Sequence, residues 1–244
     1  MQRPRLYYDL AYLWPILDPP EDFIEEAGFW KAVLSKKLGA GMHPILELGV
    51  GGGHLLSHLA SEFEATAVDI SPQMISLSRK LNPQVEHIVG DMRSVRVGRR
   101  YKAVLIHDAV SYLLSETDIS KTLETAAAHL CNGGLLIMCP DWYRETFHGI
   151  YETDRISMKD GTSIFLEQRV SDEDPQDTLI ETSFKLTFGE NGHQQTIEDI
   201  HVTGLFSLET WLTLMDKMNF DAEALPYPVY DDNEPGYLLV GSLR

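Results

Sequence analysis

The chain has 244 residues, with 37 acidic against 20 basic side chains and a formal net charge of −17. A protein that tracks a phosphate backbone needs a basic face that releases counterions, so this balance argues against DNA or RNA as a partner. No stretch approaches the roughly 18 apolar residues of a membrane span, and Asp9, Pro15 and Asp18 interrupt the N-terminus before a signal-peptide-like run develops. We expect a cytoplasmic protein without a membrane partner, built as one large domain or a domain plus a subdomain.

Short apolar runs alternate with helical patterns from residue 44 to residue 131, which is typical of βαβ units in a parallel sheet. In chain order, the predicted elements are a strand at 44–50, a turn and helix at 51–63, a strand at 64–70, a helix at 71–81, strands at 85–90 and 101–110, a helix at 116–130 and a strand at 135–140. Ser71 is the expected N-cap of its helix, and Asn132-Gly133-Gly134 is the expected helix stop. The two cysteines, Cys131 and Cys139, lack metal-type spacing and indicate reduced thiols.

The pattern changes between Thr146 and Gly204, where polar and apolar residues alternate and helical periodicity disappears. Asp160-Gly161 and Asn191-Gly192 are typical hairpin turns. We expect an antiparallel sheet at 146–204, inserted between two parts of the main domain, 1–145 and 205–244. A helix at 207–219 and strands at 221–230 and 236–243 complete an α/β fold with a doubly wound, seven-stranded, Rossmann-like sheet.

A glycine-rich turn follows the first strand, at Glu47-Leu48-Gly49-Val50-Gly51-Gly52-Gly53. Glycines at positions 49, 51 and 53 let a ligand approach the backbone and leave helix N–H groups free to bind it. The sixth position of a GxGxxG pattern is His54, so the nicotinamide fingerprint is incomplete, and no Gly-Lys-Ser/Thr follows to make a P-loop. Glu47 is an acid within an apolar strand, and a cationic ligand group nearby would offset the cost of burying it.

Two further acids follow neighbouring strands. Asp69 closes the second strand, 20 residues after Gly49, and Asp91 follows the third. The ends of parallel strands share one edge, where Asp69 suits ribose hydroxyls and Asp91 can accept from an exocyclic amino group. Apolar cover for a flat base is offered by Ile70, Met74 and Met92. Together these residues predict an adenosine-bearing cofactor.

At this point the sequence resembles the class I S-adenosylmethionine-dependent methyltransferases. The motifs that carry the resemblance are ExGxGxG at 47–53, Val68-Asp69-Ile70-Ser71, Gly90-Asp91-Met92-Arg93 and Asn132-Gly133-Gly134, in order and spacing over about residues 40–140. The resemblance implies S-adenosylmethionine as the cofactor. It also implies that Glu47 and the glycine loop contact the methionine end, Asp69 the ribose hydroxyls, and Asp91 with Met92 the adenine.

A narrower resemblance extends over nearly the whole chain, to dimethyltransferases that methylate the amino group of nucleotide-linked deoxysugars in antibiotic biosynthesis. The segments that carry it are Tyr8-Asp9-Leu10 with Tyr12, Tyr112-Leu113, residues 140–147, the antiparallel insertion, Asp199-Ile200-His201-Val202 and Leu205-Phe206. An N-terminal segment folded over the cofactor would bring Tyr8 to it. The chain departs from this group at His107-Asp108-Ala109, where those enzymes carry apolar residues.

Proton removal is part of the chemistry if the acceptor is an alkyl amine. With a Lys-like pKa near 10.4, deprotonation at pH 7 costs roughly 4 to 5 kcal/mol, so a nearby base is useful. His107 and Asp108 end the fourth strand and are candidates, although His107 also suits a cofactor contact through its backbone. Further catalytic candidates are Tyr12 and His201. The pocket would be closed by Tyr112, Asp141 and His148.

Neither a metal nor a phosphate site is clearly indicated. His54 and His58 lie four residues apart but lack the HExxH glutamate and a third ligand, so we expect no metal. The basic cluster at 93–102, which contains Arg93, Arg96, Arg99, Arg100 and Lys102, precedes the fourth strand and is expected at the edge opposite the cofactor. Candidates for a phosphate are then Arg144, Arg155 and Arg169.

The sequence thus predicts a methyltransferase that acts on a small molecule, through an amine nitrogen, with an amino sugar as one option and a homodimer as a possible assembly. The alternatives are a nicotinamide-dependent oxidoreductase and a non-catalytic cofactor-binding protein. Acidic residues gather at 18–26, 172–181 and 231–234, and two of these segments are expected to face the acceptor. This charge favours an amine or another non-phosphorylated acceptor, in the acceptor site that the inserted sheet at 146–204 is expected to cover.

Overall fold

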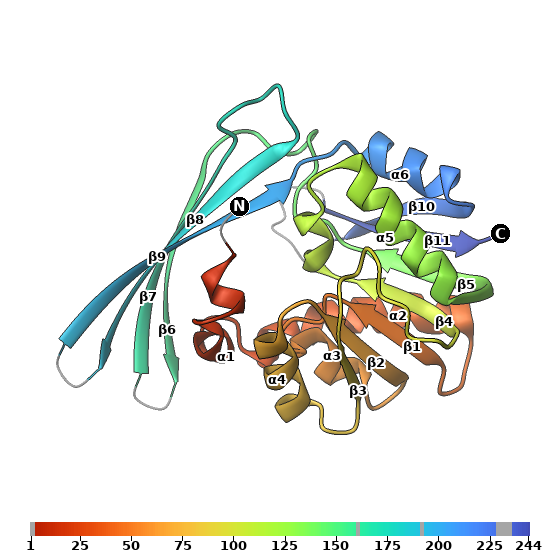
Figure 1. Ribbon diagram of the computed structural model, residues 1–244, viewed down its shortest axis with the longest axis horizontal. Helices are drawn as coiled ribbons and strands as arrows, with labels where there is room; N and C mark the ends of the chain where they lie inside the picture. Colours follow the sequence, from red (N-terminus) through yellow and green to blue (C-terminus); the bar gives the residue numbers. More distant parts are fainter. Residues whose placement is uncertain (1–2, 160–161, 191–192, 228–235) are drawn as a thin grey trace.

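The computed structural model describes residues 3–159, 162–190, 193–227 and 236–244, and it contains two separate sheets (Figure 1). The larger sheet has the strand order β10-β11-β5-β4-β1-β2-β3. Its strands are β1 (Pro44–Leu48), β2 (Glu64–Asp69), β3 (Glu86–Val89), β4 (Tyr101–Ile106), β5 (Leu130–Met138), β10 (Phe220–Tyr227) and β11 (Gly236–Leu243). The first five strands are parallel, and β11 runs antiparallel to both of its neighbours. The predicted doubly wound, seven-stranded sheet is confirmed.

Helices cover both faces of this sheet. One face carries α2 (Ile24–Leu38), α3 (His54–Leu59) and α4 (Pro72–Leu81), and the other carries α5 (Glu116–His129) and α6 (Leu208–Lys217). The predicted cap of α4 is confirmed, because Ser71 Oγ accepts a hydrogen bond from the Met74 N–H at 3.2 Å. None of the helices in the described part of the chain has the length and apolar composition that crossing a membrane requires.

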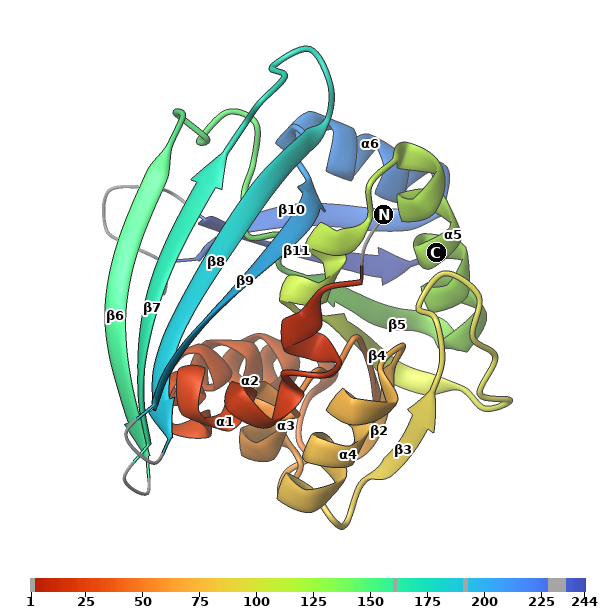
Figure 2. The same cartoon turned by 60° about the vertical axis from the view of Figure 1, so that its left-hand side comes forward.

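The second sheet is antiparallel and follows the chain order, β6 (Tyr151–Lys159), β7 (Thr162–Ser171), β8 (Leu179–Glu190) and β9 (His193–Gly204). Its long strands run beside the main domain (Figure 2). In the strand register, Lys159 lies opposite Thr162 and Glu190 lies opposite His193. The predicted turns Asp160-Gly161 and Asn191-Gly192 themselves lie outside the described residues.

The N-terminal segment lies between the two sheets (Figures 1 and 2). It consists of short helical turns, η1 (Arg5–Tyr7), η2 (Ala11–Leu13), α1 (Trp14–Leu17) and η3 (Pro20–Phe23). Buried leucines of this segment pack on the inner face of the inserted sheet, and this cluster contains Leu6, Leu10, Leu13, Leu17, Ile164, Leu166, Leu186, Phe188 and Ile197. Apolar burial of this kind stabilises by about 25 cal/mol per Å², so the segment holds the inserted sheet against the main domain.

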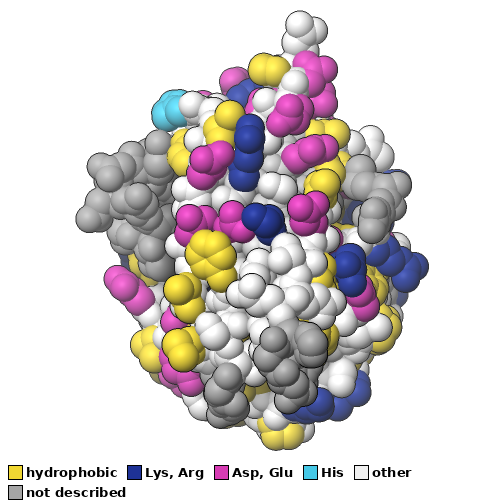
Figure 3. Space-filling model, turned by 90° about the vertical axis from the view of Figure 1, so that its left-hand side faces the viewer, with side chains coloured by type: hydrophobic (Ala, Val, Ile, Leu, Met, Phe, Trp, Pro, Cys, Tyr) yellow, Lys and Arg dark blue, Asp and Glu magenta, His cyan; other side chains and the backbone are white. Residues whose placement is uncertain are grey.

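The outer face of the inserted sheet carries acidic and basic side chains that are interspersed (Figure 3). Lys185 pairs with Glu167 at 2.6 Å and Arg169 with Glu152 at 3.9 Å. Exposed pairs of this type stabilise weakly, by about 0 to 1 kcal/mol each. This view therefore shows no continuous basic surface.

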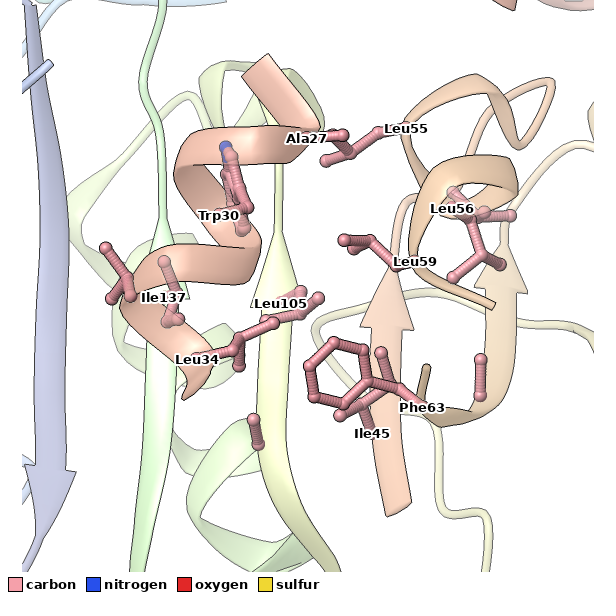
Figure 4. Packing of buried hydrophobic residues seen from close by; sticks show 14 of the residues in the cluster. Ala27, Trp30, Leu34, Ile45, Leu55, Leu56, Leu59, Phe63, Leu105 and Ile137 are labelled. Carbon is pink, nitrogen blue, oxygen red and sulfur yellow. The ribbon is translucent and has the colours of Figure 1, made fainter. Parts of the chain in front are cut away.

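The core under α2 and α3 shows how the helices position the parallel strands (Figure 4). Trp30 and Leu34 of α2 and Leu59 of α3 are fully buried against Ile45 of β1 and Leu105 of β4. Fully burying each such side chain stabilises the fold by about 1.5 to 3 kcal/mol. This packing fixes the C-terminal ends of β1 and β4 relative to each other, and those ends border the candidate site.

Two predicted boundaries are wrong. The strand expected at 101–110 ends at Ile106, and the chain continues into a 3₁₀ turn, η4 (Asp108–Tyr112). The helix stop expected at Asn132-Gly133-Gly134 lies within β5, because Leu130 already pairs with Tyr101 and the register then shifts before Ala103. The glycines thus accommodate a bulge in a strand, with Gly133 at φ 72°.

Candidate functional site

A cavity of about 760 Å³ lies where the parallel strands end. One side is formed by residues that follow β1, β2, β4 and β5, and the other by the N-terminal segment and the inserted sheet. Ligands of open α/β sheets bind at this carboxyl edge of the strands. Of the residues predicted for the cofactor, the cavity lining contains Tyr8, Glu47, Gly49, Gly51, Asp69, Ile70, Met74, Asp91, Met92 and His107.

The glycine loop packs tightly against the segment that follows β4. Gly49 has φ 78°, and a Cβ there would collide with the Cβ of Ala109. Gly53 lies outside the cavity lining, contrary to its predicted contact; it has φ 79° and its carbonyl accepts a hydrogen bond from Asn82 Nδ2 at 2.9 Å. Gly49 lets the chain turn tightly at the cavity, whereas Gly53 allows α3 to pack closely on α4.

Asp69 joins the glycine loop to the start of α4. Its Oδ2 accepts from the Gly51 N–H and its Oδ1 from the Ser71 N–H, each at 2.8 Å. Burial raises the pKa of Asp69, and these backbone donors act in the opposite direction. Each carboxylate oxygen keeps acceptor capacity toward the cavity, where hydroxyl donors of a ligand can reach it.

Asp91 forms an ion pair with Arg93, a member of the basic cluster at 93–102. The guanidinium of Arg93 contacts Asp91 Oδ2 at 2.7 Å and Asp118 Oδ1 at 3.2 Å, and this hydrogen bonding lowers the pKa of Asp91. Arg93 lines the cavity, so the prediction that the whole basic cluster lies at the opposite edge is wrong. Arg99 follows that prediction, because it pairs with Glu64 and Glu86 at the starts of β2 and β3.

Glu47 is 2% exposed and its Oε2 has no hydrogen-bond partner among the described residues. Burial raises the pKa of Glu47 to about 8. A buried carboxyl oxygen without a partner is costly, and Glu47 borders the cavity beside Gly49. The carboxyl group therefore fits a ligand that brings a cationic or N–H donor to this end of the cavity.

His107 sits in a buried ion pair with Glu26 of α2. Its Nε2 lies 2.7 Å from Glu26 Oε1 and 3.1 Å from Asp108 Oδ1, and the Tyr227 hydroxyl donates to the same Glu26 oxygen at 2.5 Å. Burial alone would lower the pKa of His107, but Asp108 and Glu26 raise it to about 10. An imidazolium is a hydrogen-bond donor, so this geometry favours a positioning role over a basic one.

A second polar network borders the cavity and joins η1, η4 and β9. Tyr112 Oη donates to Tyr7 Oη at 2.9 Å and lies 2.7 Å from His201 Nδ1. His201 Nε2 lies 2.9 Å from Asp199 Oδ2, which also accepts from the Leu6 N–H at 2.8 Å. His201 and Tyr112, which the sequence predicts for this site, thus lie together at the cavity.

Of the two N-terminal tyrosines predicted for the site, Tyr8 lines the cavity and Tyr12 does not. Tyr12 is 60% exposed and outside the cavity lining, while Tyr7 lines the cavity. Tyr7, Tyr8 and Tyr12 all lie in one short segment, and the irregular turns of η1 and η2 have no fixed period from which the inward residue follows. Asp108 and Asp141 line the cavity as predicted, whereas His148 is exposed and outside it.

Arg144, Arg155, Arg169 and His58 are not among the residues that line the cavity. Arg144 donates to the backbone carbonyl of Pro175, Arg155 pairs with Asp18 at 3.8 Å, and Arg169 pairs with Glu152. His58 hydrogen-bonds the carbonyl of Pro20. In the described ranges of the chain, no group of three or more His, Cys, Asp or Glu side chains is arranged to hold a metal, and the Cys131 thiol is free.

Comparison with known proteins gives a consistent result. Residues 45–134 match the family model described as a methyltransferase domain. A curated relative, the dTDP-3-amino-3,4,6-trideoxy-alpha-D-glucopyranose N,N-dimethyltransferase of Streptomyces venezuelae, is 28% identical over 165 residues, which cover 66% of this chain and 68% of the relative.

Two solved structures share the fold. A sugar N-methyltransferase from Streptoalloteichus is 21% identical with a TM-score of 0.85, covering 100% of this chain and 95% of that one. An amino pentose methyltransferase from Micromonospora echinaspora, solved with S-adenosylmethionine bound, is 20% identical with a TM-score of 0.77, covering 90% and 91%. All three named proteins are methyltransferases, which does not support the oxidoreductase alternative.

Proposed function

We propose that this chain, which belongs to the S-adenosylmethionine-dependent methyltransferases, methylates an amine nitrogen of a small, sugar-sized acceptor. The observation that supports this most is the composition of the cavity. One side has glycine-loop and strand-end acids, and the other side, from the inserted sheet, has neutral hydrogen-bonding residues. The first side suits the cofactor and the second suits an acceptor rich in hydroxyl groups.

The cofactor side fits S-adenosylmethionine residue by residue. The unpartnered Oε2 of Glu47 would receive the ammonium group of the methionine end beside Gly49, and Asp69 would accept from the ribose hydroxyls. Asp91 and Met92 would border the adenine. Apolar cover would come from Ile70, Met74 and Tyr8. When bound, the cofactor supplies a methyl group on a sulfonium, and the protein accelerates its transfer chiefly by alignment.

The acceptor side is formed by the inserted sheet, for which we propose the boundaries 146–204. Its cavity-facing side chains are Tyr151, Thr153, Gln168, Val170, Thr182, Phe184, His201 and Thr203. Hydroxyl and amide groups next to aromatic rings are suited to a sugar ring, which offers hydroxyl groups on its rim and C–H groups on its faces.

The charge of the cavity favours a cationic acceptor. Asp18, Asp108 and Asp141 line it, and the one arginine among the described lining residues is Arg93, which is paired with Asp91 and Asp118. Burial raises the pKa of Asp18 to about 6, and desolvation within the cavity together with the neighbouring Asp108 carboxylate raises the pKa of Asp141 well above its usual range. We therefore propose an amino sugar without a phosphate group, although the curated relative acts, by its name, on a dTDP-linked sugar.

Methyl transfer from labelled S-adenosylmethionine tests the function directly. We expect labelled product with at least one member of a panel of free amino sugars and aminocyclitols, and less product with the corresponding dTDP-linked amino sugars. Faster turnover of the dTDP-linked compounds would contradict the proposal on phosphate. Cofactor binding without methyl transfer to any amine in the panel would instead favour a non-catalytic cofactor-binding protein.

The assembly and partners form part of the same proposal. A net charge of −17 disfavours nucleic acid as a partner, and we propose that the chain acts on small molecules, as a homodimer. Light scattering coupled to size exclusion measures the mass directly, and a single species with the 27.6 kDa mass of one chain would contradict the dimer.

A further inference from the structure

We propose that Tyr7, Tyr112, His201 and Asp199 form a proton path that removes the proton from the acceptor's ammonium group before methyl transfer. The inference rests on the proposed function, because it concerns an amine held in the same cavity. It assigns a role to a network whose members come from three different segments of the chain.

The path has one end in the cavity and one end in the protein interior. Its three contacts are Tyr7 Oη to Tyr112 Oη at 2.9 Å, Tyr112 Oη to His201 Nδ1 at 2.7 Å, and His201 Nε2 to Asp199 Oδ2 at 2.9 Å. Tyr7, Tyr112 and His201 line the cavity, whereas Asp199 is 4% exposed and lies outside the lining. A proton can therefore enter from a ligand and move away from it.

The N-terminal segment completes the path. Tyr7 belongs to η1, and the neighbouring Leu6 N–H donates to Asp199 Oδ2, so the same carboxylate orients His201 and anchors the segment. The ring of Phe184 packs edge-on against His201, with 4.7 Å between ring centroids. These contacts restrain the imidazole so that Nδ1 stays directed at Tyr112.

The protonation states suit a path that ends on His201. Burial raises the pKa of both Tyr7 and Tyr112, so the phenols stay neutral and only pass protons on. Burial alone would raise the pKa of Asp199, but hydrogen bonds from His201 and Leu6 lower it overall. An ionised Asp199 accepts Nε2–H, and this leaves Nδ1 of a neutral His201 as the proton acceptor.

The other charged groups do not take this role. Arg5 and Asp9, which lie near Asp199, pair with each other at 2.6 Å. Asp108 and Asp141 act on the two tyrosines from across the cavity, where they favour neutral phenols. Two other histidines line the cavity: His107 already donates to Glu26, and His54 packs edge-on against the ring of Phe23, with 5.7 Å between ring centroids.

The proton transfer balances as follows. The acceptor's N–H bond breaks, the nitrogen keeps the electron pair, and the proton bonds to Tyr7 Oη. The hydroxyl proton of Tyr7 moves to Tyr112 Oη, and that of Tyr112 moves to His201 Nδ1. A phenol O–H rotates freely, so Tyr112 donates to His201 before the transfer and to Tyr7 after it.

The nitrogen then bonds to the methyl carbon while the carbon–sulfur bond breaks and its electrons return to sulfur. One proton remains on His201 for each methyl transferred, opposite the carboxylate of Asp199. That proton must leave to water before the next cycle.

His201→Gln tests the path, with His129→Gln as the matched control. His129 is also buried, accepts from the Val97 N–H at 2.9 Å, and lies outside the cavity lining. With the fastest acceptor from the amino-sugar panel, we expect His201→Gln to lower kcat about 10²-fold at pH 7.5. The difference should narrow as the pH approaches the pKa of the acceptor amine, because solution then removes the proton. His129→Gln should keep the wild-type pH profile. A loss that is equal at every pH, or no loss, would overturn the proposal.

A tautomer measurement decides the same question without an acceptor. In nitrogen-15 NMR of the histidine rings, with the signal assigned by its loss in His201→Gln, we expect neutral His201 to carry its proton on Nε2. Asp199→Asn should leave that proton on Nε2, because its amide oxygen must face both the Leu6 N–H and Nε2, and it is therefore the control for the assignment. A wild-type proton on Nδ1 would overturn the path.

Thermal unfolding with the demethylated cofactor product tests the proposed function separately from the proton path. We expect the product to raise the Tm of the wild type and of both His201→Gln and Asp199→Asn. No rise in the Tm of the wild type would contradict the proposed function. The position of the His201 ring proton, measured by NMR, would still test the proton path.

Discussion

Glu26 Oε1 and His107 Nε2 lie 2.7 Å apart in the core between α2 and the end of β4. The Glu26 side chain is 7% exposed and the His107 side chain 10%, so the pair is largely shielded from water. It joins the helix that covers the parallel sheet to the floor of the cavity. The charge of His107 therefore affects both the stability of the fold and the ligands that the cavity accepts.

His107→Gln should destabilise the protein. Removing one partner of a buried ion pair leaves the other charge uncompensated, which typically costs about 3 to 5 kcal/mol. The Tyr227 hydroxyl still donates to Glu26, so we expect a loss of about 3 kcal/mol in the free energy of unfolding, measured by urea denaturation at pH 7. A double change to Gln at positions 26 and 107 should recover part of the loss, and a double variant less stable than both single variants would contradict the pairing.

The same ion pair predicts that the stability of the folded state depends on pH. The pKa of His107 is raised to about 10 in the folded chain, against about 6.5 for an unfolded histidine. The folded state therefore holds a proton that the unfolded state releases, and the resulting stability is full below pH 6.5 and is lost as pH rises toward 10. The difference in the free energy of unfolding between the wild type and His107→Gln, measured by urea denaturation between pH 6 and pH 10, should decrease steadily as the pH rises. A difference that grows with pH would contradict the assignment of the charge.

Glu47 should release a proton when a cationic cofactor binds. Its folded pKa of about 8 keeps the carboxyl group protonated at pH 7, and an ammonium group at Oε2 would stabilise the ionised form. Calorimetry of cofactor binding at pH 7, in buffers with different ionisation enthalpies, should show proton release that is absent in Glu47→Gln. Equal enthalpies in all buffers for the wild type would contradict the placement of the ammonium group.

Asp69→Ala should abolish the rise in Tm that S-adenosylmethionine or its demethylated product produces in the wild type. The change removes the acceptor for ribose hydroxyls and the acceptor for the Gly51 and Ser71 N–H groups. Because the glycine loop loses support as well, Asp69→Asn is the control: it keeps the shape and one acceptor oxygen, so its binding should be weakened but measurable. A full Tm rise in Asp69→Ala would exclude Asp69 from the site.

Those parts of the site that follow strands of the main sheet were predictable from sequence. Glu47, Asp69 and His107 each end or follow a parallel strand, and parallel strand ends meet at one edge whatever the tertiary detail. Tyr7 was not predictable, because it lies in irregular turns whose orientation is set by packing on the distant inserted sheet. Glu26 was missed for the same reason: nothing local in an acidic helix start indicates which carboxylate will meet a histidine 81 residues away.

Gly49→Ala tests the tight turn at the cavity, and Ala109→Gly is its compensating change. An alanine at position 49 would meet the Cβ of Ala109 and would adopt φ 78°, a conformation that costs a non-glycine residue about 1 to 2 kcal/mol. Overpacking adds about 1 to 3 kcal/mol, so we expect a loss of about 3 kcal/mol in the free energy of unfolding and weaker cofactor binding. The double variant should regain the overpacking part and keep the backbone part, since only the collision is relieved. Urea denaturation of the two single variants and the double variant gives the coupling energy, and simple additivity of the two changes would show that the two residues do not meet.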